Sequence, residues 1–250
     1  MKFKNKVVIV SGGARDIGKA ISLKLAAEGA KVAINYHGSE DKAKATLAEI
    51  THAGGQAIIV QGDMTKSADV NSLIEKTLAE YGPKIDSLVN VVGGLVARKT
   101  IDEMDEDFFN QVMGLNLNST FLTTKACTPH MPRGSSIVNF SSLAARDGGG
   151  PGASVYATSK AAVTTFTRAM AKELGPKGIR VNALCPGVIS TLFHDTFSKD
   201  EVRKNIANAT PLGREGAPDE VADAVAYLAS DESSFITGAN LDINGGLFFS

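Results

Sequence analysis

Short apolar runs rich in β-branched residues recur along the chain, at residues 7–10, 31–35, 57–61, 87–92, 135–140, 179–184 and 240–243. Each run is too short for a helix and is typical of a strand buried on both faces. The segments between them place apolar residues at helical spacing. This alternation predicts an α/β fold in which helices cover both faces of a parallel sheet.

The chain has 250 residues, of which 43% are hydrophobic, which is enough to bury one large core. No Pro/Ser-rich linker, low-complexity tract or internal repeat divides it, so we predict a single domain. The one extended irregular stretch away from the glycine-rich turn is predicted at about residues 186–205. Loops of that length in a compact domain are usually functional.

Charge is nearly balanced, with 26 Lys and Arg against 27 Asp and Glu, so the basic stripe of a nucleic-acid surface is not expected. The N-terminal apolar run is too short for a signal peptide, and no apolar stretch is long enough to span a membrane. Cys127 and Cys185 fit neither a metal site nor a disulfide framework, and the four histidines lack metal-ligand spacing. These features predict a cytoplasmic protein without a bound metal.

The N-terminal part has the pattern of a dinucleotide-binding βαβ unit. A strand pattern, a glycine-rich turn at residues 11–18, a helical pattern and a second strand pattern follow one another within residues 6–35. Gly12 permits the tight turn, and Gly18 lets the helix pack close to the strand. Backbone N–H groups at the helix start would face a pyrophosphate.

A tyrosine and a lysine four residues apart, Tyr156 and Lys160, are the leading candidates for chemistry. On a helix they share one face. A free tyrosine has a pKa of about 10, and a fixed cation lowers that pKa toward neutrality. Ser142, after the apolar run 137–140, can hold a substrate oxygen beside the phenol, although Ser141 competes for this role. The pair alone is more typical of a half-buried tyrosine beside a solvated lysine, so the βαβ unit decides the interpretation.

Together these features resemble the short-chain dehydrogenase/reductase family. Its further motifs follow in order: Asp63, Asn90 with Gly93, Asn116, Pro186-Gly187, Thr191, Ile236-Thr237-Gly238 and Asp242-Ile243-Asn244-Gly245-Gly246. The resemblance covers about residues 5–246. It implies a Rossmann-like doubly wound parallel sheet, with a cofactor half at about 1–115, a catalytic half at about 116–250 and a substrate lid at about 186–205.

The resemblance implies an NAD(P)H-dependent carbonyl reductase. Tyr156 is then the general acid/base, Ser142 hydrogen-bonds the reacting oxygen, and Lys160 lowers the Tyr156 pKa and binds the nicotinamide ribose. Asn116 would hold a water that passes protons to Lys160; its alternative is a helix-bend residue without a catalytic part. A cofactor-binding scaffold without turnover is the competing class of function, but such a protein is free to lose these four residues.

The implied cofactor-binding residues are Gly12, Gly13, Arg15, Asp16, Ile17, Gly18, Asn35, Tyr36, His37, Asp63, Met64, Asn90, Gly93, Tyr156, Lys160, Pro186, Gly187, Ile189 and Thr191. Two positions depart from the family pattern. Asp16 stands where glycine is usual, and Val91 stands where a second asparagine is usual. Asp16 either caps the following helix or weakens cofactor affinity by facing an anionic pyrophosphate.

The end of the second strand predicts the cofactor preference. NAD-preferring members generally have an acidic residue there, whereas here Asn35, Tyr36 and His37 precede the first acid, Glu40. Arg15 can meet a 2′-phosphate. We therefore predict a preference for NADP(H), with NAD(H) as a possible cofactor; a solvated Arg15 and no preference is the alternative.

Three loop segments, at residues 93–99, 148–153 and 188–195, resemble bacterial reductases that act on the keto-uronate released by exolytic alginate lyases (4-deoxy-L-erythro-5-hexoseulose uronate, reduced to 2-keto-3-deoxygluconate). The generic alternative is a reductase of the 3-oxoacyl-carrier-protein type. The candidate substrate-binding residues are Arg98, Lys99, Arg146, Gly149 and His194. The cations would bind a carboxylate, and for each of them, as for His194, a solvated surface role is the alternative.

The C-terminal tail contains Leu247, Phe248 and Phe249. Termini are normally polar and frayed unless tied down, so three apolar residues there predict burial in a subunit interface. The family resemblance implies a homotetramer.

Overall fold

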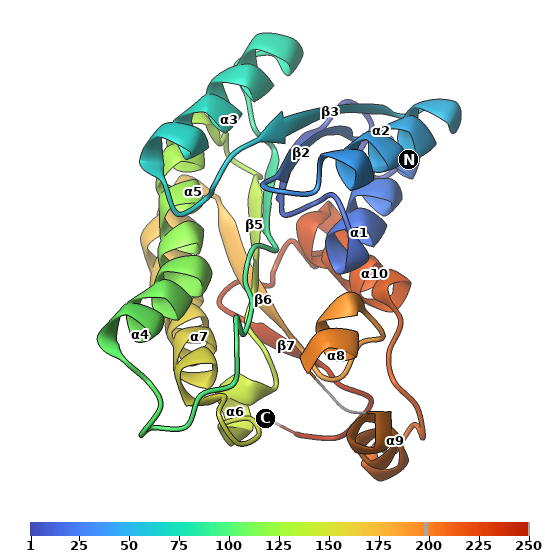
Figure 1. The fold of residues 1–250 in the computed structure, drawn as a ribbon. Helices are drawn as coiled ribbons and strands as arrows, with labels where there is room; N and C mark the ends of the chain where they lie inside the picture. Colours follow the sequence, from blue (N-terminus) through green and yellow to red (C-terminus); the bar gives the residue numbers. More distant parts are fainter. Residues whose placement is uncertain (198–199, 250) are drawn as a thin grey trace.

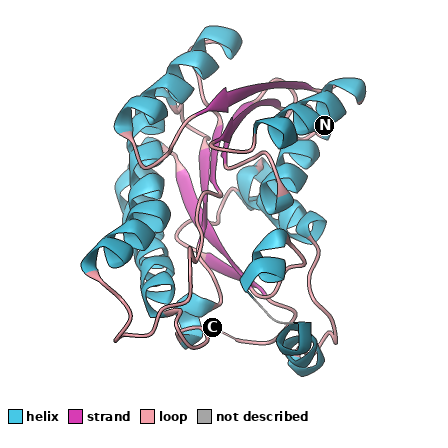
Figure 2. Ribbon diagram, in the orientation of Figure 1, coloured by secondary structure: helices cyan, strands magenta, loops and turns pink. Residues whose placement is uncertain are grey.

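The architecture is one parallel sheet between two layers of helices (Figures 1 and 2). The computed structural model describes residues 1–197 and 200–249, with the backbone alone for residues 193–195 and 200. Within these residues the strands lie in the order β3-β2-β1-β4-β5-β6-β7, all in parallel register. The strands are β1 (Val7–Ser11), β2 (Lys31–Tyr36), β3 (Gln56–Gln61), β4 (Ser87–Asn90), β5 (Ser136–Phe140), β6 (Arg180–Pro186) and β7 (Asn240–Ile243). The predicted fold class and strands are confirmed, each strand within two residues.

Helices cover both faces of the sheet because its central strands have apolar side chains on both sides. One layer contains α1 (Asp16–Ala27), α2 (Glu40–His52) and α10 (Pro218–Ala229); the other contains α3 (Ser67–Tyr81), α5 (Ser119–Cys127) and α7 (Ser154–Leu174) (Figure 1). Val8 and Val10 pack against the first layer, whereas Ile9 between them packs against the second. Each strand therefore joins two separate cores.

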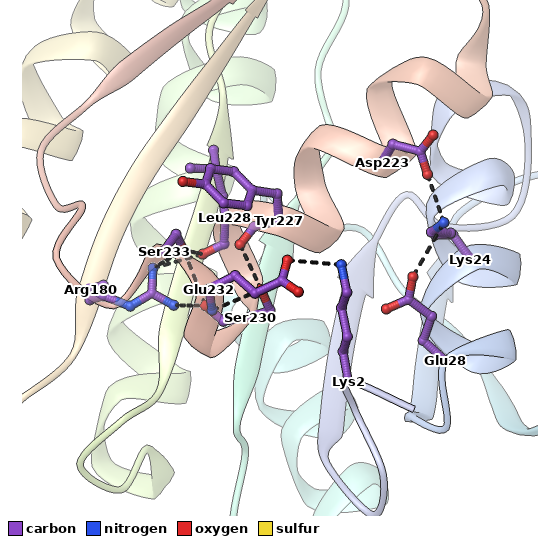
Figure 3. Close-up of polar contacts among 10 residues, drawn as sticks. All are labelled: Lys2, Lys24, Glu28, Arg180, Asp223, Tyr227, Leu228, Ser230, Glu232 and Ser233. Carbon is purple, nitrogen blue, oxygen red and sulfur yellow. Dashed lines mark hydrogen bonds and ion pairs between the residues drawn. The ribbon is translucent and has the colours of Figure 1, made fainter.

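Polar contacts connect the N-terminal segment and α1 to α10 and the turn after it (Figure 3). Lys24 of α1 lies 2.7 Å from the carboxylate of Asp223 of α10, and Lys2 lies 2.9 Å from Glu232. Such exposed pairs add little stability. Arg180 of β6 is half-buried and donates to the backbone oxygens of Leu228 and Ser230 (Figure 3). These contacts lie away from the carboxyl ends of the strands.

From β1 the chain adds β2 and β3 on one side of the sheet, and then β4 to β7 on the other side. The switch point of the sheet therefore lies between β1 and β4. Ser11 at the end of β1 pairs with Asn90 at the end of β4. The loops that follow these strands diverge from this point. In open α/β sheets, ligands bind at this switch point.

The irregular segment predicted at residues 186–205 is wrong in part, because two helices form there: α8 (Leu192–Phe197) and α9 (Asp200–Ala209). Residues 200–209 are rich in Glu, Arg, Lys and Ala, which have high helix propensity. Two further helices are α4 (Glu106–Met113) and α6 (Ala144–Asp147).

Candidate active site

A cavity of about 620 Å³ lies at the carboxyl ends of the strands, where the switch point predicts a ligand site. The predicted residues that line it are Gly12, Arg15, Asp16, Ile17, Gly18, Asn35, Tyr36, His37, Asp63, Met64, Gly93, Arg98, Ser142, Gly149, Tyr156, Lys160, Pro186, Gly187, Ile189 and Thr191. Of the other candidates, Gly13, Asn90, Lys99, Asn116 and Arg146 do not line it. The side chain of His194 lies outside the described part of the chain.

The glycine-rich loop after β1 forms one end of the cavity without side chains in the way. A Cβ atom at Gly18 would lie 2.1 Å from the backbone oxygen of Gly12, so only glycine allows α1 to begin this close to the turn. Gly12 has a φ of +69°, which favours glycine. The loop thus leaves its backbone accessible to a dinucleotide, and the residues fit such a cofactor.

The end of β2 is joined to this loop through a buried side chain. Asn35 accepts a hydrogen bond from the Gly12 N–H at 3.2 Å and donates to the backbone oxygen of Gly62 at 3.0 Å. Tyr36 and His37 follow it along the cavity wall. The end of β2 therefore presents an amide, a phenol and an imidazole, and none of these three residues supplies a carboxylate.

Asp63 supplies a carboxylate at the end of β3. Burial by itself raises the pKa of Asp63, but two hydrogen bonds from Thr65, together with the nearby Lys66, lower it overall. Asp63 is therefore an ionised acceptor on the wall of the cavity.

Asp16 has an unusual backbone conformation for a residue other than glycine, with a φ of +50°. One carboxylate oxygen lies 2.7 Å from Arg15 Nη1, and the other accepts the backbone N–H of Leu192 at 3.2 Å. Arg15 is the N-cap residue of α1, and Asp16 is the acidic residue of its first turn, where a carboxylate suits the helix dipole. The Asp16 carboxylate contacts the first residue of α8, which is distant in the sequence.

Ser142, Tyr156 and Lys160 meet at the other end of the cavity. The Ser142 hydroxyl hydrogen-bonds the Tyr156 phenol. Lys160 Nζ lies 5.9 Å from the centre of the Tyr156 ring and donates to the backbone oxygen of Phe140 at 2.8 Å. Ser141 is buried and donates to the backbone oxygen of Lys160 at 2.9 Å, so its hydroxyl is engaged away from the phenol. The geometry favours Ser142 over Ser141.

Burial controls the ionisation of this group. It raises the pKa of Tyr156, and the opposing hydrogen bond from Ser142 is the smaller effect. Contrary to the expectation from the sequence, Lys160 does not bring this pKa down. Burial also lowers the pKa of Lys160 to about 8, because the ammonium loses its hydration. At neutral pH the site therefore contains a neutral phenol, which can donate a proton, beside a cation.

Asn116 lies in a π-helical turn, Gly114–Asn118, between α4 and α5. Its Oδ1 accepts the Gly94 N–H at 2.9 Å, and its Nδ2 donates to the backbone oxygens of Gly94 and Val112. Single π-turns are frequent at functional sites. A Cβ at Gly93 would lie 2.6 Å from Asn116 Oδ1 and 2.8 Å from Lys160 Nζ, so Asn116 adjoins the lysine while fixing the loop after β4. Its water-holding role stays a prediction.

Asn90 points away from the cavity. Its Nδ2 donates to Asn139 Oδ1 at 2.9 Å, and its Oδ1 accepts from the Thr123 hydroxyl at 2.7 Å. The assignment of Asn90 to the cofactor is therefore not supported, because its amide joins β4 to β5 and α5. Gly13 likewise packs on α1, since a Cβ there would lie 2.8 Å from the Ser22 hydroxyl.

Two of the predicted substrate cations are occupied elsewhere. Arg146 Nε lies 3.4 Å from the Asp242 carboxylate, and its Nη2 donates to the backbone oxygen of Asn240. Lys99 Nζ lies 4.6 Å from the centre of the Phe108 ring. Neither reaches the cavity, so their assignment to a substrate carboxylate is not supported.

Arg98 differs from these two because it lines the cavity. Its Nη1 donates to the backbone oxygen of Pro151 at 2.9 Å, and its Nε donates to that of Phe197 at 3.2 Å. Sequence reasoning did not identify Leu143, Asp147 and Ile206, which also line the cavity. Nothing in their local patterns distinguishes them, since the fold alone brings them to this wall.

Comparison with known proteins agrees with this geometry. The family model described as enoyl-(acyl carrier protein) reductase matches residues 12–248. A short-chain dehydrogenase from Burkholderia cenocepacia, solved in complex with NADP, is 32% identical, with a TM-score of 0.92 over 99% of each chain. This chain belongs to the short-chain dehydrogenase/reductase family.

Two further relatives have different descriptions. The 3-oxoacyl-(acyl-carrier-protein) reductase FabG of Staphylococcus epidermidis is 35% identical over 98% of this chain and 99% of its own. The structure of an NADH-dependent reductase A1-R′ responsible for alginate metabolism is 33% identical, with a TM-score of 0.90 over 99% of each chain. The present protein is an NAD(P)-dependent oxidoreductase of this family.

Two kinds of feature are absent from the described residues. No helix there has both the length and the hydropathy needed to cross a bilayer. In the same part of the chain, no group of three or more His, Cys, Asp and Glu side chains is arranged to hold a metal ion.

Proposed function

We propose that this protein is an NADPH-preferring carbonyl reductase whose substrate is a small keto-uronate or related keto acid. The observation that supports it most is the position of Arg98, a cation on the wall of the cavity that also contains Ser142, Tyr156 and Lys160. A guanidinium can orient a carboxylate with parallel hydrogen bonds. The likeness to the NADH-dependent reductase responsible for alginate metabolism supports a substrate from that metabolism.

In this proposal the bound nicotinamide supplies a hydride to the carbonyl carbon. The Tyr156 phenol, neutral because burial raises its pKa, donates its proton to the carbonyl oxygen. Ser142 hydrogen-bonds the phenol and can donate to the same substrate oxygen. The Lys160 ammonium stabilises the phenolate that remains, and preorganised donors of this kind supply much of an enzyme's rate enhancement.

The preference for NADPH rests on the end of β2. Asn35 is bound to Gly12 and Gly62, and the next two residues, Tyr36 and His37, offer no carboxylate to a ribose 2′-hydroxyl. Arg15 lies on the same wall, although it is paired with Asp16. The ratio of kcat/KM for NADPH and NADH tests this. A tenfold preference for NADH would overturn it.

A 3-oxoacyl-carrier-protein substrate is the second candidate. The identity with FabG supports it, and the apolar side chains of Leu143 and Ile206 on the cavity wall suit an acyl chain. Both candidates use the same catalytic residues. They differ in whether the substrate needs a cation beside its reacting carbonyl.

One substrate panel separates them: keto-uronates, acetoacetyl thioesters and neutral α-dicarbonyls, with NADPH oxidation as the readout. We expect the highest kcat/KM for a keto-uronate. Arg98→Ala should reduce kcat/KM at least about tenfold more for the acidic substrate than for a neutral dicarbonyl, a difference of about 1.4 kcal/mol. Some loss on both is expected, because Arg98 also binds Pro151 and Phe197. Equal losses, or a preference for the thioester, would refute the keto acid proposal.

A further inference from the structure

Helix α8 lies in the segment that the family resemblance predicts to be a lid, and each of its ends contacts a charged side chain from another loop. At its start, the Leu192 N–H donates to Asp16 Oδ1 at 3.2 Å. At its end, the backbone oxygen of Phe197 accepts from Arg98 Nε at 3.2 Å. A carboxylate at the N-terminus and a guanidinium at the C-terminus both suit the helix dipole.

The two charged residues come from different loops that line the cavity. Asp16 belongs to the glycine-rich loop after β1, whereas Arg98 follows β4 and also binds the backbone oxygen of Pro151 at 2.9 Å. Gly152 allows this close contact, since a Cβ there would lie 3.0 Å from the Cβ of Arg98. Thr191, which directly precedes α8, lines the cavity. The contacts thus connect three loops around one opening.

The backbone of Asp16 supports a specific role for its side chain. Its φ of +50° suits glycine better than aspartate. Conformations of this kind persist where the surrounding structure holds them, often at ligand sites. Here the carboxylate holds two partners at once, Arg15 and Leu192.

We propose that Asp16 and Arg98 are positioning residues that hold the two ends of α8 over the cavity and so slow the release of bound cofactor. Asp16 in addition reduces the effect of Arg15 on a 2′-phosphate, because its carboxylate pairs with the Arg15 guanidinium at 2.7 Å. The inference depends on cofactor binding in this cavity and not on the identity of the carbonyl substrate.

Two substitutions at one position separate the hydrogen bond from the charge. Asp16→Gly removes both and accepts the positive φ without strain. Asp16→Asn removes the charge, tolerates this φ and keeps an oxygen that can accept the Leu192 N–H. NADH is the probe for the lid, because it lacks the phosphate on which Arg15 would act.

We expect Asp16→Gly to raise the NADH dissociation rate about three- to tenfold, the range for losing one hydrogen bond. Deuterium uptake in peptides that span residues 186–197 should rise with it. Asp16→Asn should keep both values within about twofold of the wild type, while raising the ratio of NADPH to NADH affinity. Asp223→Asn, which removes a surface carboxylate from the pair with Lys24, is the matched control and should change neither.

Several results would overturn the proposal. Unchanged NADH release and uptake in Asp16→Gly would show that the contact does not hold the lid. Equal changes in the Gly and Asn variants would assign the effect to charge and not to the hydrogen bond. Arg98→Met gives the second test, since it should raise uptake in the same peptides whichever carbonyl compound is the substrate. If deuterium uptake in that variant equals that of the wild type, Arg98 does not hold the end of α8.

Discussion

Lys160 is a cation with only 4% of its surface exposed, and burial lowers its pKa to about 8. Its ammonium is needed beside Tyr156, so its deprotonation should reduce the reduction rate. We expect kcat/KM for NADPH, which reports groups of the free enzyme, to fall as the pH rises through about 8. A profile that stays flat from pH 7 to 9.5 would contradict this assignment.

The same burial affects stability. Below about pH 8 the folded protein holds a dehydrated ammonium, and between pH 8 and 10.5 the unfolded chain binds more protons, so the stability contribution of Lys160 rises with pH across that window. The lowering from 10.5 to about 8 means that burial of the charged Lys160 reduces the free energy of unfolding by roughly 3 kcal/mol at pH 7. Lys160→Met removes this cost but also removes the hydrogen bond to the backbone oxygen of Phe140. The variant should therefore raise the free energy of unfolding by about 1–2 kcal/mol at pH 7, and by less at pH 10. Urea unfolding of both proteins at both pH values measures this, and a destabilised variant at pH 7 would refute it.

At the residue scale, the sequence predicts groups whose relation is local or follows a motif. Tyr156 and Lys160 are four residues apart on α7, and their proximity follows from helix geometry. The role of Arg146 could not be predicted in this way, because its partner Asp242 is distant in the sequence. The contact between Asp16 and Leu192 is of the same kind. Long-range polar pairs leave no trace in spacing or composition.

At the scale of elements, the start of α1 depends on two glycines that face each other. A Cβ at Gly18 would lie 2.1 Å from the Gly12 oxygen, so Gly18→Ala must displace the loop or the helix. Overpacking of this kind costs about 1–3 kcal/mol. We expect a lower Tm and at least tenfold weaker NADPH binding.

The matched control is Gly175→Ala, at the C-terminal end of α7. Apart from its neighbours in the chain, a Cβ there would meet no atom within 4 Å, and its backbone is helical. This variant should keep both the Tm and the affinity for NADPH. If the two variants behave alike, contact with Gly12 is not what requires glycine at position 18.

The strands were predictable because buried parallel strands form continuous apolar runs between turn residues. The helices α8 and α9 were not predicted, because the family resemblance indicated an irregular lid at residues 186–205, although residues 200–209 have high helix propensity. The π-turn at Gly114–Asn118 also has no sequence signal of its own. It is apparent only where Asn116 binds the backbone of Gly94.

At the scale of the whole molecule, large apolar side chains remain exposed in the single chain. Phe109 of α4 and Phe121 of α5 are each 42% exposed, and Phe249 in the tail is 82% exposed. Exposed apolar groups of this size mark interaction surfaces when they gather in patches. We expect a homotetramer in which the tail lies in an interface.

Size-exclusion chromatography with light scattering should then give about four times the monomer mass of 26.1 kDa. Deletion of residues 247–250 should shift the protein to smaller assemblies, because it removes apolar area from the interface. A wild-type monomer at micromolar concentration would rule this assembly out.

The most direct test of the reductase assignment compares the wild type with Tyr156→Phe in two measurements, NADPH oxidation with the carbonyl panel and NADPH binding by fluorescence. The variant lacks only the hydroxyl that hydrogen-bonds Ser142. We predict that the wild type oxidises NADPH with at least one carbonyl compound, whereas Tyr156→Phe binds NADPH with an affinity within a few-fold of the wild type and loses turnover by at least about a thousandfold. A variant that turns over at the wild-type rate would contradict the role of Tyr156 as the proton donor.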